Sequence, residues 1–324
     1  MEIKIFEAFA GYGSQSMALE RLKEANPNFN YEIVGISEID PDAIKAYNIT
    51  HNPGITNYGD ITKIDWVNVP DFDLFTYSFP CTDISNIGKG EGFKEGSGTR
   101  SSLLWECKKA ITLKKPKYLL MENVKALINK KNKADFEKWE NYLSGLGYTN
   151  YWKVLNAKDY NIPQSRERVF MVSILGDHKP FQFPPTITLT KKFKDILDNN
   201  IPDDVWIKPD DKGVYSRKRI NEMLANGKIT LKKLQWVDLY SQLTYDDCVT
   251  TITTRVFGAS NHLITNVTGI RRPTKREVFR LMGVNETNID KLLTLNLNRD
   301  KFYIMAGNSI VVDVMFYLFQ NLFN

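Results

Sequence analysis

Cysteine and histidine are both scarce in this sequence of 324 residues. It contains three of each, and Cys81, Cys107 and Cys248 are far apart, with no C-x-x-C spacing. An odd number of widely spaced cysteines argues against a disulfide framework, and three scattered histidines offer no cluster for a metal ion. We therefore expect no metal site, and a reducing, cytoplasmic setting in which Cys81 stays a thiol.

Long apolar runs and a strong charge of one sign are lacking as well. We find no window of 18 or more apolar residues and no cleavable signal before the strand-like residues 3–6, so we expect no membrane span. The net charge of +5 says little about nucleic acid. Residues 208–233, however, carry eight Lys and Arg against three acids, and residues 271–280 carry five against one. Basic stretches usually form solvated surfaces, so this indication of a nucleic-acid partner is weak.

Strand-like and helix-like segments alternate through the first half of the chain. Residues 3–9 predict a strand, and the glycine turn around Gly11 and Gly13 leads into an amphipathic helix. A second strand, 31–37, precedes Asp40 and Pro41, which suit the N-cap and the first position of a helix. Further strands are predicted at 72–77, 118–121, 151–155 and 169–174, and helices at 103–113 and 136–146. This order predicts a doubly wound, Rossmann-like α/β fold.

The composition changes after about residue 178. Prolines at 180, 184, 185, 202 and 209 and lysine-rich polar stretches replace the regular alternation. Thr274 and Glu277 then fit a capping box, and the apolar helix 310–323 must be buried. We predict a catalytic and cofactor-binding domain at 1–177, a smaller, irregular and basic domain at 178–270, and a return to the first domain at 271–324.

Chemistry-bearing residues follow several of the predicted strands. Cys81 ends Ser78-Phe79-Pro80-Cys81, directly after a buried strand and before a glycine-rich loop. A lone Pro-Cys is more often a core cysteine than a nucleophile. Glu122, however, ends the next buried strand, so both side chains point into one crevice. Arg166 and Arg168 enter a later strand at i and i+2, and they are therefore expected on one face.

These motifs, in this order, resemble the DNA cytosine-5 methyltransferase family. Residues 9–13 look like its cofactor loop, 78–81 its nucleophile motif, 122–124 its acid motif and 164–168 its paired-arginine motif. Residues 280–283 and 307–309 are similar to its last two motifs, and Tyr77–Cys81 and Gly96–Glu106 are especially like the small single-chain CpG enzymes. Thr82 replaces the usual glutamine after Pro-Cys, and Ser14 replaces a second glycine in the cofactor loop.

The resemblance implies that Cys81 adds to carbon 6 of a flipped-out cytosine in double-stranded DNA, that S-adenosylmethionine provides the methyl group, and that 178–270 is the target-recognition domain. We expect a monomer. The implied catalytic residues are Cys81, Glu122, Arg166 and Arg168; the cofactor-binding residues are Phe9, Gly11, Gly13, Glu38, Ile39, Asp60, Ile61, Pro80, Leu103 and Asn308. The resemblance and the basic stretch 208–233 together give these expected DNA-binding residues: Ser85, Gly88, Gln164, Arg217, Lys218, Arg219, Thr251 and Arg255.

Three other protein classes share some of these features. A tRNA cytosine-5 methyltransferase on the same catalytic domain would carry a Cys-Phe-Thr tripeptide, which this sequence lacks. A non-enzymatic DNA-binding relative would not need Cys81, Glu122 and Arg168 together. A nicotinamide-dependent oxidoreductase would need the full G-x-G-x-x-G pattern, and the first loop does not have it.

Overall fold

The computed structural model describes residues 2–84, 92–207, 215–254 and 262–323. The chain divides into two compact units, one made of residues 1–155, 167–185 and 314–324, the other of 156–166 and 186–313. The first unit contains β1 (Glu2–Ala8), α1 (Ser14–Ala25), β2 (Asn30–Ser37), α2 (Pro41–Thr50), β3 (Leu74–Tyr77), the 3-10 helix η2 (Arg100–Glu106), α3 (Cys107–Lys114), β4 (Tyr118–Val124), α4 (Lys133–Gly145), β5 (Tyr148–Asn156), β7 (Glu167–Leu175) and most of α9 (Val312–Phe323).

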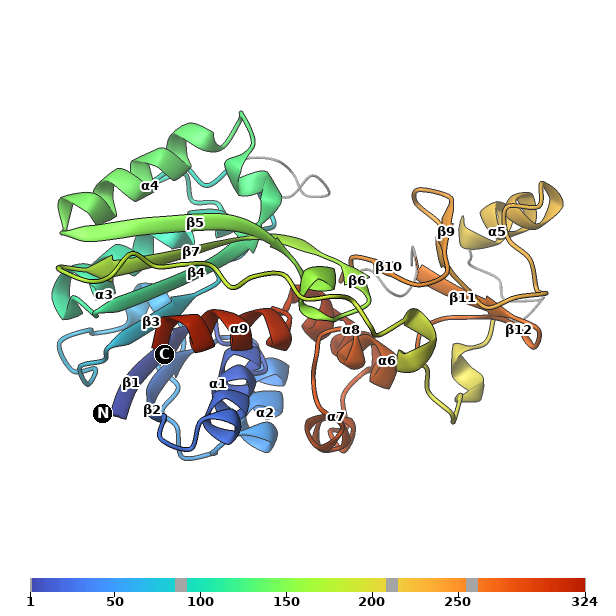
Figure 1. The fold of residues 1–324 in the computed structure, drawn as a ribbon, viewed down its shortest axis with the longest axis horizontal. Helices are drawn as coiled ribbons and strands as arrows, with labels where there is room; N and C mark the ends of the chain where they lie inside the picture. The colour runs from blue at the N-terminus through green and yellow to red at the C-terminus, as the bar shows by residue number, and fades with distance from the viewer. Residues whose placement is uncertain (1, 85–91, 208–214, 255–261, 324) are drawn as a thin grey trace. The chain divides into compact units, whose positions relative to one another are not determined.

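A six-stranded sheet in the order β2-β1-β3-β4-β7-β5 forms the centre of the first unit. β1, β2, β3 and β4 are parallel, and β7 runs antiparallel to β4. Alternate residues of each strand face opposite sides: Tyr77 of β3 contacts Trp139 of α4, whereas Glu7 of β1 faces α1 and α2. Figure 1 shows α1, α2 and α9 on one face of this sheet and α4 on the other. The predicted Rossmann-like α/β fold is confirmed.

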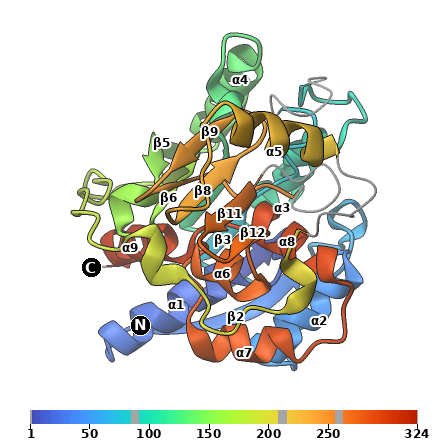
Figure 2. The same cartoon turned by 90° about the vertical axis from the view of Figure 1, so that its right-hand side faces the viewer.

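The second unit holds β6 (Gln164–Ser165), α5 (Tyr215–Ala225), β8 (Gln235–Asp238), β9 (Leu243–Tyr245), β10 (Val249–Thr250), β11 (His262–Asn266), β12 (Gly269–Arg271), α6 (Lys275–Arg280), α7 (Glu286–Leu293) and α8 (Arg299–Asn308). An antiparallel sheet, β12-β11-β8-β9, packs against α5 through Ile220 and Met223 (Figure 2). The sequence predicted an irregular segment here. Strands of three to five residues contain too few alternations for their period to be recognised.

Several predicted elements have different limits in the structure. The helix predicted at 103–113 is the 3-10 helix η2 followed by α3, and the strand predicted from Phe72 begins at Leu74. The helix caps are as predicted: Asp40 accepts hydrogen bonds from Asp42 and Ala43, and Thr274 and Glu277 form the capping box of α6. α9 returns to the first unit, where Phe323 packs on Phe29 and Tyr118.

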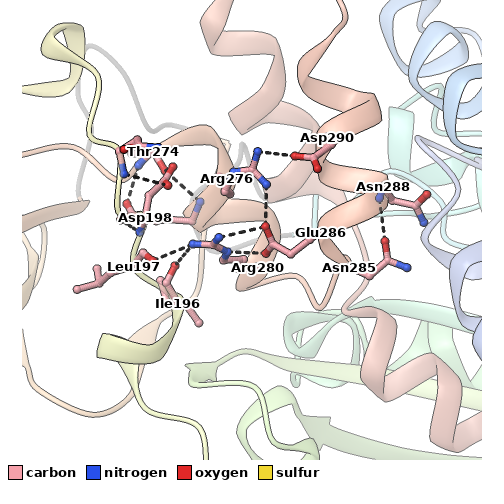
Figure 3. Close-up of polar contacts among 12 residues, drawn as sticks. Ile196, Leu197, Asp198, Thr274, Arg276, Arg280, Asn285, Glu286, Asn288 and Asp290 are labelled. Carbon is pink, nitrogen blue, oxygen red and sulfur yellow. Dashed lines mark hydrogen bonds and ion pairs between the residues drawn. The ribbon is translucent and has the colours of Figure 1, made fainter.

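The polar contacts around α6 and α7 hold that part of the second unit together (Figure 3). Arg276 and Arg280 of α6 both bond Glu286 of α7, and Arg276 also bonds Asp290. Arg280 donates to the carbonyls of Ile196 and Leu197 as well, at 3.1 and 2.8 Å. α6 is therefore fixed both to α7 and to the segment that precedes α5.

One segment corrects the expectation of no membrane-length apolar stretch. Arg299–Phe323, which covers α8 and α9, is long and apolar enough to cross a membrane by length and composition. Within the structure, 78% of its most apolar window is buried, as in core helices that pass the same test. This stretch is therefore weak evidence for a membrane span.

Candidate active site

The proposed nucleophile follows the carboxyl end of a central strand. β3 and β4 are parallel, with Tyr77 beside Met121, so the residues after Tyr77 lie next to Glu122. The Asn123 amide donates to the Phe79 carbonyl at 2.9 Å, which ties the end of β4 to the loop that carries Cys81. Cys81 is half-buried. The thiol therefore sits in a loop fixed by the neighbouring strand.

The Glu122 carboxylate is buried between two partners. Arg168 places its Nε 3.3 Å from Oε1 of Glu122, and the antiparallel register of β4 and β7 sets Arg168 beside Val124. The Ser78 hydroxyl is within hydrogen-bond distance of carboxylate Oε2 and lies 3.3 Å from the Glu122 carbonyl. The structure thus brings the predicted residues Glu122 and Arg168 together, and it adds Ser78, whose position at the end of β3 was the only signal in the sequence.

The thiol pKa is raised at the other two cysteines, Cys107 and Cys248. Cys107 is fully buried in α3, and burial raises the pKa of its thiol well above the usual range. Burial also raises the pKa of Cys248. Because the thiolate is the reactive form, neither residue is suited to act as a nucleophile near neutral pH.

The segment after Cys81 is anchored at its base by Asp83 and Ser101. The Asp83 carboxylate accepts from the Ser101 amide at 3.0 Å, and the Asp83 amide donates to the Ser101 hydroxyl at 3.2 Å. The Gly92 amide donates to the Asp83 carbonyl at 2.8 Å. Ser85 and Gly88, predicted to contact DNA, lie outside the described residues. Sequence reasoning missed both anchors.

Three left-handed residues shape the loop between β1 and α1. Phe9, Gly11 and Gly13 have φ of 56°, 59° and 86°. A Cβ at Gly11 would meet nothing within 4 Å, whereas a Cβ at Gly13 would lie 2.3 Å from Nε2 of His51. Gly11 therefore borders open space, and Gly13 is required for packing against the end of α2.

Glu38 closes this loop from the end of β2. Its carboxylate accepts hydrogen bonds from the amides of Gly11, Ile39 and Asp40, each at 2.8 Å. The side chain of Ile39 is 71% exposed. A carboxylate has about four acceptor positions, so one remains for an outside donor such as a hydroxyl.

The remaining predicted cofactor residues of the first unit lie at strand ends or nearby. Asp60 caps the 3-10 helix Ile61–Lys63, and the hydrogen bonds from Thr62 lower the pKa of its carboxyl. Ile61 is buried, and Pro80 and Leu103 are half-buried. Asn308, the last residue of α8, is exposed in the second unit.

The two arginines of the 164–168 motif make different contacts. Arg166 lies between β6 and β7, and its guanidinium donates to main-chain carbonyls of the second unit, whereas Arg168 pairs with Glu122. Gln164 is buried in the second unit, where its amide bonds Leu281 and Ile252. The expectation of two arginines on one strand face treated residues 166–168 as a single strand, but β7 begins only at Glu167.

The predicted DNA-binding residues of the second unit are spread over several elements. Lys218 of α5 is exposed, and Arg219 donates to the Leu239 carbonyl at 2.9 Å. Arg217 also lies in α5. Thr251 follows β10, and its hydroxyl donates to the Ser165 carbonyl at 2.8 Å. Arg255 lies outside the described residues. Among the described side chains, no group of three or more His, Cys, Asp or Glu could hold a metal ion.

Known proteins resemble this chain over nearly its whole length. The family model of C-5 cytosine-specific DNA methylases matches residues 3–324. The chain is 38% identical to the Type II methyltransferase M2.ScrFI of Lactococcus lactis subsp. cremoris, over 99% of both proteins. It is 30% identical to the orphan methyltransferase M.SssI of Spiroplasma monobiae, over 97% of this chain and 95% of that protein.

Solved structures show the same fold. The Entamoeba histolytica methyltransferase EhMeth gives a TM-score of 0.76 at 18% identity, over 100% of both chains. The S. pombe Dnmt2 methyltransferase gives 0.72 at 20% identity, over 98% of this chain and 97% of that one. At these identities the likeness speaks for the fold alone.

Proposed function

Because the chain belongs to the C-5 cytosine-specific DNA methylase family and is a DNA cytosine-5 methyltransferase, we propose that it acts on a cytosine flipped out of duplex DNA, with Cys81 as nucleophile. A base stacked in a duplex cannot reach a half-buried thiol, so the target must leave the stack. The observation that carries the proposal is the grouping of Ser78, Glu122 and Arg168 at the strand ends next to the Cys81 loop.

Cys81 makes carbon 5 reactive. Carbon 5 of cytosine is a poor nucleophile, but a thiolate that adds to carbon 6 turns the ring into an enamine-like species. A new sulfur–carbon bond forms at carbon 6 while the electron pair of the ring moves toward nitrogen 3. After carbon 5 has gained its methyl group and lost its proton to water, that sulfur–carbon bond breaks and Cys81 leaves.

Glu122 moves the proton that balances this charge. It donates a proton to nitrogen 3 as Cys81 adds and takes it back as Cys81 leaves. Arg168, 3.3 Å from the carboxylate, orients Glu122 and has donors left for the carbonyl of the base. We also propose that the positive charge of Arg168 favours the thiolate form of Cys81.

The cofactor is S-adenosylmethionine, which supplies an electrophilic methyl group when bound. The loop around Gly11 fits it in two respects. Open space adjoins Gly11, and the Glu38 carboxylate beside it keeps one acceptor position for a ribose hydroxyl. Ile39 offers an apolar surface for the adenine ring. Phe9, Asp60, Ile61, Pro80, Leu103 and Asn308 complete the proposed set, with Gly13 supporting the loop.

Residues 178–270 are proposed to recognise the DNA sequence. They carry the basic stretch 208–233 and the Thr251-Ile252 pair. Phosphate contacts from Arg217, Lys218 and Arg219 would add affinity, and base contacts would add specificity. Ser85, Gly88, Gln164 and Arg255 remain proposed DNA contacts. We further propose a monomeric, cytoplasmic enzyme of restriction-modification or phage self-protection.

Mass spectrometry of nucleosides tests this function. Purified protein is incubated with S-adenosylmethionine and either duplex DNA or total tRNA, and the products are digested to nucleosides. We expect 5-methyldeoxycytidine from DNA and no 5-methylcytidine from tRNA. Methylation of tRNA alone would support the tRNA alternative instead. Sequencing the methylated DNA then identifies the target site.

A further inference from the structure

Within the second unit, the Gln164–Arg166 segment contacts three other parts of the chain. These are residues 249–252, residues 307–309 and Leu281. β6 pairs in parallel with β10, with Gln164 beside Val249 and Ser165 beside Thr250. This pairing brings the segment next to residues 251 and 252, which follow β10. The proposed cofactor residue Asn308 lies at the end of α8 in the same unit.

Arg166 joins two of these parts through main-chain carbonyls. Its side chain is buried, and Nη1 donates to the Ile252 carbonyl at 2.9 Å. Nη2 donates to the carbonyls of Gly307 and Ser309, at 2.9 and 2.6 Å. One planar guanidinium thus holds residues on both sides of Asn308 and the residue after Thr251. A lysine has one nitrogen and cannot span this geometry.

Gln164 and Gly307 strengthen the same connection. The Gln164 side-chain oxygen accepts from the Ile252 amide at 2.8 Å, and its nitrogen donates to the Leu281 carbonyl at 2.6 Å. A Cβ at Gly307 would lie 2.6 Å from backbone atoms of Thr253 and Thr254. Segments 251–254 and 307–309 therefore touch backbone to backbone, and a shift of one must displace the other.

We propose that Arg166 is a positioning residue that couples cofactor binding at residues 307–309 to target recognition at residues 251–252. This inference rests on the proposed function, which assigns Asn308 to the cofactor and Thr251 to DNA. Binding at either segment fixes the carbonyls that Arg166 needs, and therefore orders the other segment as well. The coupling is reciprocal, since two ligands that share one ordered state help each other equally.

The direct test is a binding cycle without turnover. S-adenosylhomocysteine affinity is measured by calorimetry with and without a short duplex containing the mapped target site, and DNA affinity is measured with and without S-adenosylhomocysteine. For the unmodified protein we expect each ligand to tighten the other by roughly tenfold. Failure to bind S-adenosylhomocysteine would count against the proposed function. Binding of both ligands without coupling would overturn only this inference.

Arg166→Lys and Arg280→Lys form a matched pair for the same cycle. Arg280 also bridges two carbonyls in the second unit, those of Ile196 and Leu197, but it touches neither coupled segment in the contacts described above. We expect the coupling factor to fall to about one in Arg166→Lys and to persist in Arg280→Lys. Intact coupling in Arg166→Lys would overturn the inference, whatever the turnover rate of that variant.

Hydrogen exchange provides a measurement that needs no variant and no DNA. The Ile252 amide donates to Gln164, so its exchange reports on this connection. We expect S-adenosylhomocysteine alone to slow amide exchange in a peptide covering residues 249–254. Unchanged exchange there, with protection of residues 307–309, would show that cofactor binding does not reach the recognition segment.

Discussion

At the scale of single residues, the contact between Ser78 and Glu122 is the central feature of the proposed active site. The two side chains come from adjacent parallel strands, and the serine hydroxyl and the Arg168 guanidinium hold the carboxylate from two sides. A general acid must be aimed at the proton acceptor before the reaction, because a small misplacement costs much of its effect. The orientation of Glu122 is therefore as important as its presence.

Glu122→Gln should lower methyl transfer far more than cofactor binding. The amide keeps hydrogen-bonding capacity but supplies no proton to nitrogen 3. A 100-fold loss of turnover corresponds to about 2.7 kcal/mol of transition-state stabilisation. Single-turnover methylation kinetics and calorimetry with S-adenosylhomocysteine measure the two effects separately. An unchanged rate would remove Glu122 from the mechanism.

Ser78→Ala should reduce the rate constant of methylation by roughly tenfold, because the hydrogen bond that orients the Glu122 carboxyl group is lost. KM for DNA and for the methyl donor should change little, since Ser78 has no proposed contact with either. Ser78→Thr retains a hydroxyl and serves as the matched variant. We expect it to recover most of the rate. Equal losses in Ser78→Ala and Ser78→Thr would indicate that only the size of the side chain matters.

At the scale of elements, the loop between β1 and α1 contains two glycines, Gly11 and Gly13, that share a left-handed backbone but have different surroundings. Gly11 borders open space, whereas Gly13 packs against a His51 ring that is itself bonded to Glu20 and to the Gly13 carbonyl. Because the two positions share a left-handed φ, a substitution at each separates ligand binding from packing.

Gly11→Ala should lower S-adenosylhomocysteine affinity at a small cost in stability, about 1 kcal/mol for the left-handed backbone. Gly13→Ala should cost more stability, since its methyl group adds a clash with His51 to the same strain. Urea unfolding and calorimetry on both variants check this. The interpretation fails if Gly11→Ala binds S-adenosylhomocysteine as well as the unmodified protein does.

Much of the element order was predictable because strand and helix periods were repeated often enough in the first unit. The helix caps at Asp40 and Thr274 were also predictable, because capping depends on a few neighbouring residues in the sequence. Ser78, Asn123 and the Asp83–Ser101 contact were not. Their partners lie 44, 44 and 18 residues away, and no local pattern reports such pairings.

At the scale of the whole molecule, a buried acid lies in β1, the strand that precedes the loop proposed to bind the cofactor. Glu7 is completely buried between α1 and α2, where it accepts hydrogen bonds from Ser16 and Tyr47. Burial raises the pKa of its carboxyl to about 7, although the nearby His51 and the hydrogen bonds act in the opposite direction. The stability of the protein should therefore depend on pH in part through Glu7.

Between pH 4.5 and about 7, native Glu7 keeps a proton that the unfolded chain has released. Raising the pH through this window therefore lowers the free energy of unfolding, by about 3 kcal/mol in total. Glu7→Gln should remove this loss and be more stable than the unmodified protein above pH 7. Urea titrations across the window measure it, with Glu2→Gln on the same strand as control.

The comparison of Glu7→Gln with the unmodified protein is necessary because His262 changes the free energy of unfolding with pH in the opposite direction. Burial lowers the pKa of its imidazole to about 4, so its contribution to stability is lost as the pH falls from 6.5 toward 4. The difference between Glu7→Gln and the unmodified protein isolates Glu7. If that difference is the same at pH 5 and pH 8, Glu7 does not titrate as described.

The central claim is that Cys81 forms a bond to the target cytosine. A duplex with 5-fluorocytosine at the mapped site tests it most directly, because fluorine cannot leave as a proton does and the protein stays attached after methyl transfer. In the presence of S-adenosylmethionine, we predict a complex that survives denaturing electrophoresis for the unmodified protein and for Cys248→Ala, and none for Cys81→Ala. A denaturation-resistant complex with Cys81→Ala would contradict the account.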